Sequence, residues 1–236
     1  MRTALITGAS RGLGFAFVEQ LANQGYQVFA TYRSLPADCP LAMFSHPHVY
    51  TCQMDVGKDN SIARAYKEIA AQSGHLDVLI NNAAINHDSP KLHKPSTTQL
   101  GSLERSELLA MFDINTIAPT LIVQRFLSLL NDSTVINISS YRASFTRRDN
   151  DNNYNNYGYA ASKVALNMMT RDLAHDLQSR RVRVYAIDPG SVHTAMNKRG
   201  EQTPDQAANK ILTTLHTLTP EQSGQYFDNQ GRKAEL

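Results

Sequence analysis

The chain has 236 residues and a formal net charge of +2. This length suits one large α/β domain or two small ones with a buried core, and the small charge does not indicate a nucleic-acid or anionic-membrane partner. Two cysteines, Cys39 and Cys52, are too few for a disulfide framework and fit a reducing compartment. No leader-like start and no apolar run long enough to span a bilayer is visible, so we expect a cytoplasmic protein.

The first element is an apolar strand over residues 4–7. It runs into the turn Gly8-Ala-Ser-Arg-Gly12-Leu-Gly14, and a helix with apolar residues at helical spacing follows. Glycine lets the backbone approach a pyrophosphate, and the helix N-terminus offers free N–H groups. The spacing differs from the commoner Gly-x-Gly-x-x-Gly. A plain turn that caps a helix is the alternative, but the strand–turn–helix order favours a nucleotide site.

The second strand covers residues 27–32 and ends without the acidic residue that usually holds an adenosine ribose 2′-OH. Arg33 stands there instead, and Arg11 lies in the glycine turn. Two guanidinium groups suit a 2′-phosphate through charge-assisted hydrogen bonds. The pattern therefore favours NADP(H) over NAD(H), with a solvated surface arginine at position 33 as the alternative.

The third and fourth strands also end in polar or small residues. Residues 34–47 are proline-rich and predict a loop with at most a short helix. Strand 49–54 ends at Asp55-Val56, where the carboxylate could accept a hydrogen bond from an adenine amino group or cap the helix that follows. Strand 76–80 ends in Asn81-Asn82-Ala83-Ala84, whose small side chains let backbone pass close to a ligand.

A long polar loop over residues 86–104 precedes a long amphipathic helix over residues 104–130. This helix contains Asn115 and, four residues later, Pro119, so a kink or an opened hydrogen bond is expected nearby. Strand 134–138 ends in Ser139-Ser140. The asparagine-rich residues 147–156 have no apolar period and predict a mobile surface excursion.

Tyr159-Ala-Ala-Ser-Lys163 is the stretch with the clearest chemical potential, on a helix expected to run to about residue 180. Residues four apart share one helical face, and an ammonium beside a phenol lowers the phenol's pKa. A surface pair would give the same spacing by chance. Strand 182–187 follows and ends in Asp188-Pro189-Gly190, a last helix spans about 203–216, and a short strand covers 225–227.

Strands alternating with helices predict one α/β domain over residues 1–236, doubly wound in the Rossmann manner. We expect a seven-stranded, mostly parallel sheet with helices on both faces. Ligands in such sheets bind at the carboxyl ends of the strands. The features noted above fall at the ends of strands one to six, which raises the weight of the Tyr159–Lys163 pair.

These residues resemble the short-chain dehydrogenase/reductase family over essentially the whole chain. The motifs in the family's order are Thr7-Gly-Ala-Ser-Arg-Gly-Leu-Gly14, Asp55, Asn81-Asn82-Ala83, Asn115, Ser140, Tyr159, Lys163, Pro189-Gly190 and Thr194. Within the family, the tail Leu218-Thr-Pro-Glu-Gln-Ser-Gly224, with Tyr226-Phe-Asp228 and Gly231, is similar to the C-factor/sniffer-type group. Members of that group are similar to carbonyl reductases, and some are tied to signalling.

The resemblance implies hydride transfer between a nicotinamide and a carbonyl or alcohol carbon. Tyr159 would give a proton to the developing alkoxide, and Lys163 would lower its pKa and hold the nicotinamide ribose. Ser140 would hydrogen-bond the carbonyl oxygen. Ser140 is preferred to Ser139 because alternation after the strand aims only one of them at the site, and the family's alignment favours the second. Asn115 would open its helix and hold a water for proton relay.

The same resemblance implies a cofactor site along the carboxyl ends of the strands. Its residues are Gly8, Ser10, Arg11, Gly12, Leu13, Gly14, Arg33, Asp55, Val56, Asn82, Ala83, Ala84, Tyr159, Lys163, Pro189, Gly190, Val192 and Thr194. No histidine pair has metal spacing on one element, so we predict no metal. Family members usually associate through the helices that hold Asn115 and Tyr159, so we expect a homodimer or homotetramer.

The sequence departs from the family's pattern in three places. Ala84 stands where glycine is usual, the asparagine-rich segment enlarges the gap between Ser140 and Tyr159, and the stretch after Thr194 is short.

Two hypotheses about function remain. The first is an NADPH-dependent reductase of small carbonyl compounds. The second is a cofactor-binding signalling or regulatory protein with little turnover, against which the intact catalytic set argues.

Overall fold

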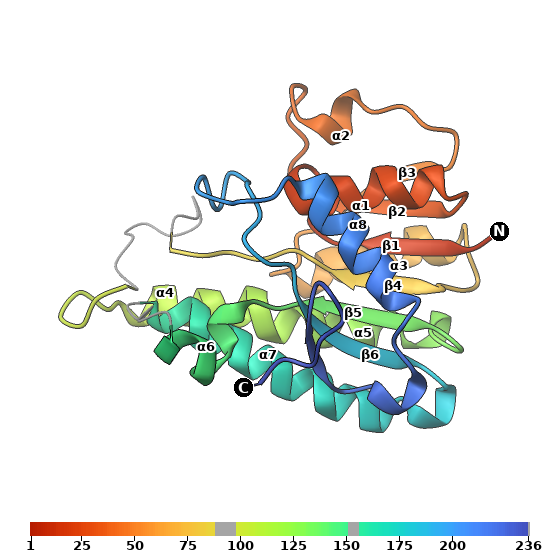
Figure 1. Cartoon of the computed structure of the whole chain (residues 1–236). Helices are drawn as coiled ribbons and strands as arrows, with labels where there is room; N and C mark the ends of the chain where they lie inside the picture. Colours follow the sequence, from red (N-terminus) through yellow and green to blue (C-terminus); the bar gives the residue numbers. More distant parts are fainter. Residues whose placement is uncertain (88–97, 151–155, 236) are drawn as a thin grey trace.

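The strands form one parallel sheet in the computed structural model, which describes residues 1–87, 98–150 and 156–235 (Figure 1). The strands are β1 (Thr3–Ile6), β2 (Gln27–Tyr32), β3 (Val49–Gln53), β4 (Val78–Asn81), β5 (Thr134–Ile138), β6 (Arg183–Asp188) and β7 (Tyr226–Asp228). They pair in the order β3-β2-β1-β4-β5-β6-β7, and every pair is parallel. The expected doubly wound fold class is confirmed, and the direction of winding reverses between β1 and β4.

Helices cover both faces of the sheet because alternate strand residues are apolar on both sides. On one side, Ala4 and Ile6 pack with α1 (Gly12–Asn23) and α8 (Pro204–Leu215). On the other, Leu5 packs with α3 (Asp59–Ala70), α5 (Ala118–Arg125) and α7 (Tyr157–Asp176). Figure 1 shows the carboxyl ends of the strands pointing to the side of the molecule where the loops after β4 and β6 gather.

The long predicted helix is interrupted where Asn115 lies. It consists of α4 (Arg105–Phe112), a π-helical turn η1 (Asp113–Ile117) and α5, followed by the 3-10 turn η2 (Leu127–Leu129). Proline cannot donate to the carbonyl one turn earlier, and a π turn accommodates the lost hydrogen bond. The expected opening near Pro119 is therefore confirmed.

One expectation about apolar segments was wrong. By length and composition, the 21-residue helical stretch Arg105–Arg125 could cross a membrane. Half of its most apolar window is buried inside the molecule, where α5 packs on the sheet. A core helix meets the same criterion, since the interior and a bilayer both favour apolar side chains.

Most other predicted boundaries agree with the structure within two or three residues. The predicted short helix in the 34–47 loop is α2 (Pro40–Met43), and Thr203 begins α8 with a capping box. The excursion predicted for residues 147–156 is wrong in its first part, because α6 (Phe145–Asn150) is helical. Residues 151–155, and 88–97 of the loop after β4, lie outside the described residues.

Candidate active site

The glycine turn after β1 is locked to the end of β4. The Thr7 hydroxyl accepts the N–H groups of Asn82 at 3.0 Å and Ala83 at 2.9 Å. The Asn82 amide donates back to the carbonyls of Thr7 at 2.9 Å and Gly8 at 3.2 Å. Gly8 has a φ of +65°, and a Cβ added there would lie 2.9 Å from the Ala83 Cα. Only glycine fits this position, so the turn forms a shallow backbone cradle.

The N-terminus of α1 opens onto this cradle. The first turn of α1 holds Gly12, Leu13 and Gly14, whose N–H groups have no carbonyl partner within the helix, and no acidic side chain occupies that turn. Gly12 has a φ of +59°, and a Cβ there would contact the Thr194 side chain at 3.4 Å. The loop after β6 therefore reaches the glycine turn, and the donors present fit a pyrophosphate.

Two arginines stand at the adenosine end of the predicted cofactor site. Arg33 directly follows β2 and is exposed, as is Arg11 in the glycine turn, while the Ser10 carbonyl accepts the Leu41 N–H at 3.3 Å. Asp55 receives the Gly57 N–H at 3.2 Å and its own N–H donates to Ser61 at 3.0 Å, so it organises the turn into α3. The roles of Asp55 and of the half-buried Val56 toward an adenine stay predictions.

Ser140 and Tyr159 come together at the carboxyl end of β5. The Ser140 hydroxyl is hydrogen-bonded to the Tyr159 phenol and also accepts the Arg142 N–H at 3.3 Å. Ser139 turns the other way and donates to Asn167 at 2.6 Å. Strand alternation therefore aims Ser140, and not Ser139, at Tyr159, as the sequence predicts.

The structure corrects one electrostatic expectation. Burial raises the pKa of Tyr159 to about 12, against the lowering effect of the hydrogen bond from Ser140. Burial also lowers the pKa of Lys163 to about 7, and its Nζ donates to the Ile138 carbonyl at 2.7 Å. The ammonium lies 5.7 Å from the Tyr159 ring centroid. Lys163 is thus near the phenol but does not bring its pKa below the ordinary value here.

Asn115 is fully buried in the π turn and fixes the chain that leaves β4. Its side-chain oxygen accepts the Ile85 N–H at 2.8 Å, and its amide donates to the Ile85 carbonyl at 2.9 Å and to Ser162 at 3.0 Å. Ala84, the departure from the family's glycine, is half-buried directly before Ile85. Asn115 therefore joins β4 to α7 behind Tyr159, and its role toward a water stays a prediction.

The turn after β6 completes the arrangement. Gly190 has a φ of +77°, and the Pro189 carbonyl accepts hydrogen bonds from Gln202 at 2.6 Å and Asn229 at 2.8 Å. Val192 is buried and pairs with Gln202 in an isolated bridge. The short segment after Thr194 is held in tight turns, and the Asn86 amide reaches its Met196 carbonyl at 3.2 Å.

Two residues that the sequence did not assign also contact this site. The carboxylate of Asp188 is almost completely buried, and the Tyr226 hydroxyl donates to the Ser140 carbonyl at 2.8 Å. A carboxylate that ends an otherwise apolar strand is a signal that could have identified Asp188. Nothing in the sequence indicates that the last strand reaches Ser140.

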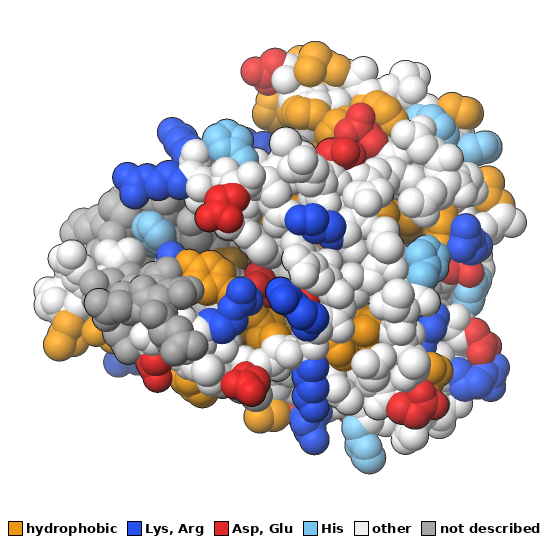
Figure 2. Space-filling model, viewed as in Figure 1, with side chains coloured by type: hydrophobic (Ala, Val, Ile, Leu, Met, Phe, Trp, Pro, Cys, Tyr) orange, Lys and Arg blue, Asp and Glu red, His pale blue; other side chains and the backbone are white. Residues whose placement is uncertain are grey.

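Other surface features lie away from these residues. A hollow of about 850 Å³ lies at the amino-terminal ends of β6 and β7, and none of the predicted site residues lines it. Figure 2 shows basic, acidic and uncharged side chains interleaved over one face, in keeping with the small net charge. No group of three or more metal-ligating side chains occurs within the described ranges, and the metal-free site stays a prediction.

Comparison with known proteins agrees with this geometry. Residues 2–205 match the family model described as short chain dehydrogenase. Protein FixR of Bradyrhizobium diazoefficiens is 31% identical over 83% of this chain and 68% of its own length. An NADPH-bound carbonyl reductase from chicken fatty liver superposes with a TM-score of 0.88, at 26% identity over 100% of this chain and 99% of that one. Carbonyl reductase Sniffer of D. melanogaster gives 0.87 and 26%, covering both chains fully.

Proposed function

This chain belongs to the short-chain dehydrogenase family, and on that premise we propose that it is an NADPH-dependent reductase of small aldehydes, ketones or related carbonyl compounds. As a family member it is an oxidoreductase of carbonyl and alcohol groups. The observation that carries the proposal is the hydrogen-bonded Ser140–Tyr159 pair beside Lys163, at the strand ends that also hold the glycine cradle. The likeness to an NADPH-bound carbonyl reductase supports the same activity.

The chain's own groups divide the work at the carbonyl oxygen. A bound nicotinamide supplies or accepts the hydride. The Ser140 hydroxyl donates to the Tyr159 phenol and accepts the Arg142 N–H in this structure, and it would redirect its proton to a substrate oxygen that becomes negative. Tyr159, kept protonated by its raised pKa, delivers the proton that turns this oxygen into a hydroxyl.

Lys163 and Asn115 do not touch the carbonyl oxygen but support the proton transfer by Tyr159. Lys163 lies within one helical turn of Tyr159, and its ammonium is suited to hold the ribose hydroxyls of the cofactor. Asn115 holds the Ile85 backbone and Ser162, and we propose that its π turn also positions a water that returns a proton to Tyr159. This second role rests on the likeness to the family.

NADPH preference is supported by the exposed Arg11 and Arg33. A guanidinium can bind a 2′-phosphate through two parallel hydrogen bonds, which a ribose hydroxyl cannot match. We expect Arg33→Ala to lower kcat/KM with NADPH by about tenfold and with NADH by much less, since one charge-assisted contact contributes about 1.5 kcal/mol or more. Arg125→Ala, an exposed arginine on α5, is the matched control.

The test follows NADPH and NADH consumption with a panel of aldehydes, diketones and quinones. Wild type and Tyr157→Phe should turn over the same substrates, because Tyr157 is exposed and has no lysine four residues later. Tyr159→Phe should lose this turnover while it still binds the nucleotide. Nucleotide binding without turnover by the wild type would support the regulatory hypothesis instead.

We further propose a homodimer or homotetramer working in the cytoplasm. The support for association is a group of exposed apolar side chains on α4, the π turn, α6 and α7, here called the apolar face. Its residues are Leu109, Ile117, Phe145, Tyr157, Met168 and Met169. A groove of about 490 Å³ between α6 and α7 runs through it. Two free thiols support a reducing compartment.

A further inference from the structure

A single buried carboxylate connects three segments around the candidate site. Asp188 ends β6 and is 2% exposed. One of its oxygens accepts the Gly190 N–H at 3.0 Å, and the other accepts Nη1 of Arg147 at 3.1 Å. It also accepts the backbone N–H of Tyr141. A buried carboxylate needs such donors, because leaving the charge unpaired in the interior is very costly.

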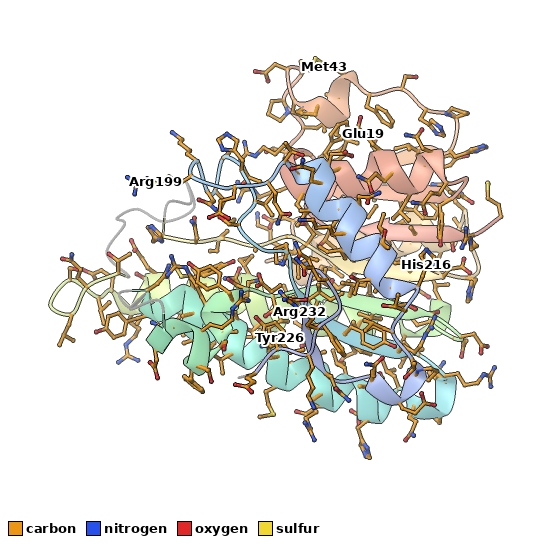
Figure 3. The ribbon with its side chains drawn as sticks, in the orientation of Figure 1. Glu19, Met43, Arg199, His216, Tyr226 and Arg232 are labelled. Atoms are coloured by element: carbon orange, nitrogen blue, oxygen red, sulfur yellow. The ribbon has the colours of Figure 1, made fainter. Side chains whose placement is uncertain are left out.

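Each of the three donors belongs to a segment next to the reaction. Tyr141 directly follows Ser140, and Gly190 belongs to the turn assigned to the cofactor. Arg147 lies on α6, which continues the chain beyond the Ser140 turn. The Ser140 turn is held from a fourth side by Tyr226 of β7, which lies beside the C-terminal turn that carries Arg232 (Figure 3).

We propose that Asp188 is a positioning residue for the reaction: with Arg147 it fixes the turn that carries Ser140 relative to the turn at Gly190. The inference rests on the proposed function, since it concerns the placement of Ser140 and Tyr159. A donor displaced by about 1 Å can cost a factor of about one hundred in rate, so a rigid link between the two turns has a direct kinetic value.

The charge of Asp188 also faces the phenol that transfers the proton. Asp188 and Tyr141 act to raise the Tyr159 pKa, while Ser140 and Arg142 act to lower it. Lys163 lies on the same helix as Tyr159. Around Asp188 itself, the facing charged and titratable groups are Arg147 of α6, and Asp228 and Tyr226 of β7. A neutral side chain at 188 should therefore lower the Tyr159 pKa.

The experiment compares Asp188→Asn, Arg147→Gln and Arg147→Lys with wild type. Asparagine keeps an oxygen for the N–H groups of Gly190 and Tyr141 but loses the charge that pairs with Arg147. We expect Asp188→Asn and Arg147→Gln each to lower kcat by about tenfold to a hundredfold. Arg147→Lys should restore most of the loss, and the double variant should lose less than the product of the two single losses.

The pH profile separates positioning from simple loss of structure. Asp188→Asn should move the basic limb of the kcat profile to lower pH, because the charge that raises the Tyr159 pKa is gone. The matched control is Arg181→Gln, which breaks the exposed Arg181–Asp132 pair at the amino-terminal ends of β5 and β6. Arg181→Gln should change neither kcat nor the position of the basic limb of the pH profile.

Hydrogen exchange tests the same link without turnover. Amides of the 140–149 segment should exchange faster in Arg147→Gln than in wild type or Arg181→Gln. Arg147 is half-exposed, so its variants can fold even if Asp188→Asn does not. Unchanged exchange in Arg147→Gln, or a kcat and basic limb equal to wild type, would overturn the inference. A wild type without turnover would refute the proposed function instead, and the exchange measurement would still decide whether the link exists.

Discussion

Lys163 carries its ammonium in the interior, where the residue is 2% exposed, and donates a hydrogen bond to the Ile138 carbonyl. An amine without a facing carboxylate gives up part of its proton affinity when it is buried, which is why its pKa falls to about 7. Near neutral pH this side chain therefore exists in both protonation states.

The same burial makes stability depend on pH in a defined window. The unfolded lysine binds its proton up to about pH 10.5, but the folded one releases it near pH 7, so the unfolded state holds more protons between these values. Stability should then rise with pH, by about 1.5 kcal/mol from pH 7 to 8.5. Lys163→Met should lack this rise in urea unfolding.

Two groups with raised pKa values oppose this rise mainly above the window. Tyr159 and Cys52 have pKa values of about 12 in the folded protein, against ordinary values of 10.0 and 9.0, so they remove stability as the pH rises through those ordinary values. Cys52 begins to do so near about pH 8.5, equally in wild type and in Lys163→Met. Equal slopes for wild type and Lys163→Met between pH 7 and 8.5 would show that the ammonium is not desolvated in the folded protein.

At the scale of elements, the π turn determines how β4 joins the helices. Asn115→Ala should remove the partners of the buried Ile85 N–H and C=O groups and destabilise the fold by about 2–4 kcal/mol. Urea unfolding measures the loss. Thr120→Ala, which removes only a hydroxyl bond to the helix carbonyl of Thr116, should cost under about 1 kcal/mol. A similar cost for both variants would contradict the structural role of Asn115.

The glycine cradle allows a graded test along the chain. An alanine at position 8 would be strained twice, by the left-handed φ and by the close approach of its Cβ to Ala83. At Gly25 only the left-handed φ of +81° would strain an alanine, and at Gly74 neither cause is present. Destabilisation should decrease in the order Gly8→Ala, Gly25→Ala, Gly74→Ala, with about 1–2 kcal/mol for the left-handed strain. Only Gly8→Ala should weaken NADPH binding in fluorescence titration, and loss of binding in Gly25→Ala would contradict this account.

The elements show what the sequence could predict. Bounds of β2 and β5 were predicted to the residue, because an apolar run ends sharply at a polar or glycine-containing turn on each side. The helix α6 was not predicted, since its residues lack an apolar period and its Arg147 is held by Asp188, far along the chain. Long-range pairing of this kind leaves no local pattern.

The sequence predicted which residues make up the candidate site, but it did not predict their pKa shifts. Tyr159, Lys163, Ser140 and the glycine turn follow from spacing and strand ends. The direction of the Tyr159 pKa shift did not follow, because spacing reports which groups are near but not how deeply they are buried. The Asp188 link and the contact of Tyr226 with Ser140 depend on which strands are neighbours, which is a property of the folded sheet.

At the scale of the molecule, the apolar face should be covered by a second copy of the chain. Met168 on α7 is 56% exposed, and Met168→Lys would place a charge in the centre of such an interface. Light scattering should show wild type as a dimer or tetramer and Met168→Lys at least about tenfold weaker in association. Met43→Lys, on α2 at the opposite side of the molecule (Figure 3), should associate as wild type does. A monomeric wild type would contradict the proposal.

The contact between Tyr226 and Ser140 forms late during synthesis of the protein, because Tyr226 lies near the C-terminus. Synthesis proceeds at about 5–20 residues per second, so the ribosome delivers Tyr226 many seconds after the glycine turn at Gly8. The segments of the cofactor site around Gly8, Asn82 and Gly190 all precede Tyr226 in the chain, so each of them is synthesised before the Ser140 turn receives its last support. The order of translation therefore places the support of the catalytic turn after the parts that would hold the nucleotide.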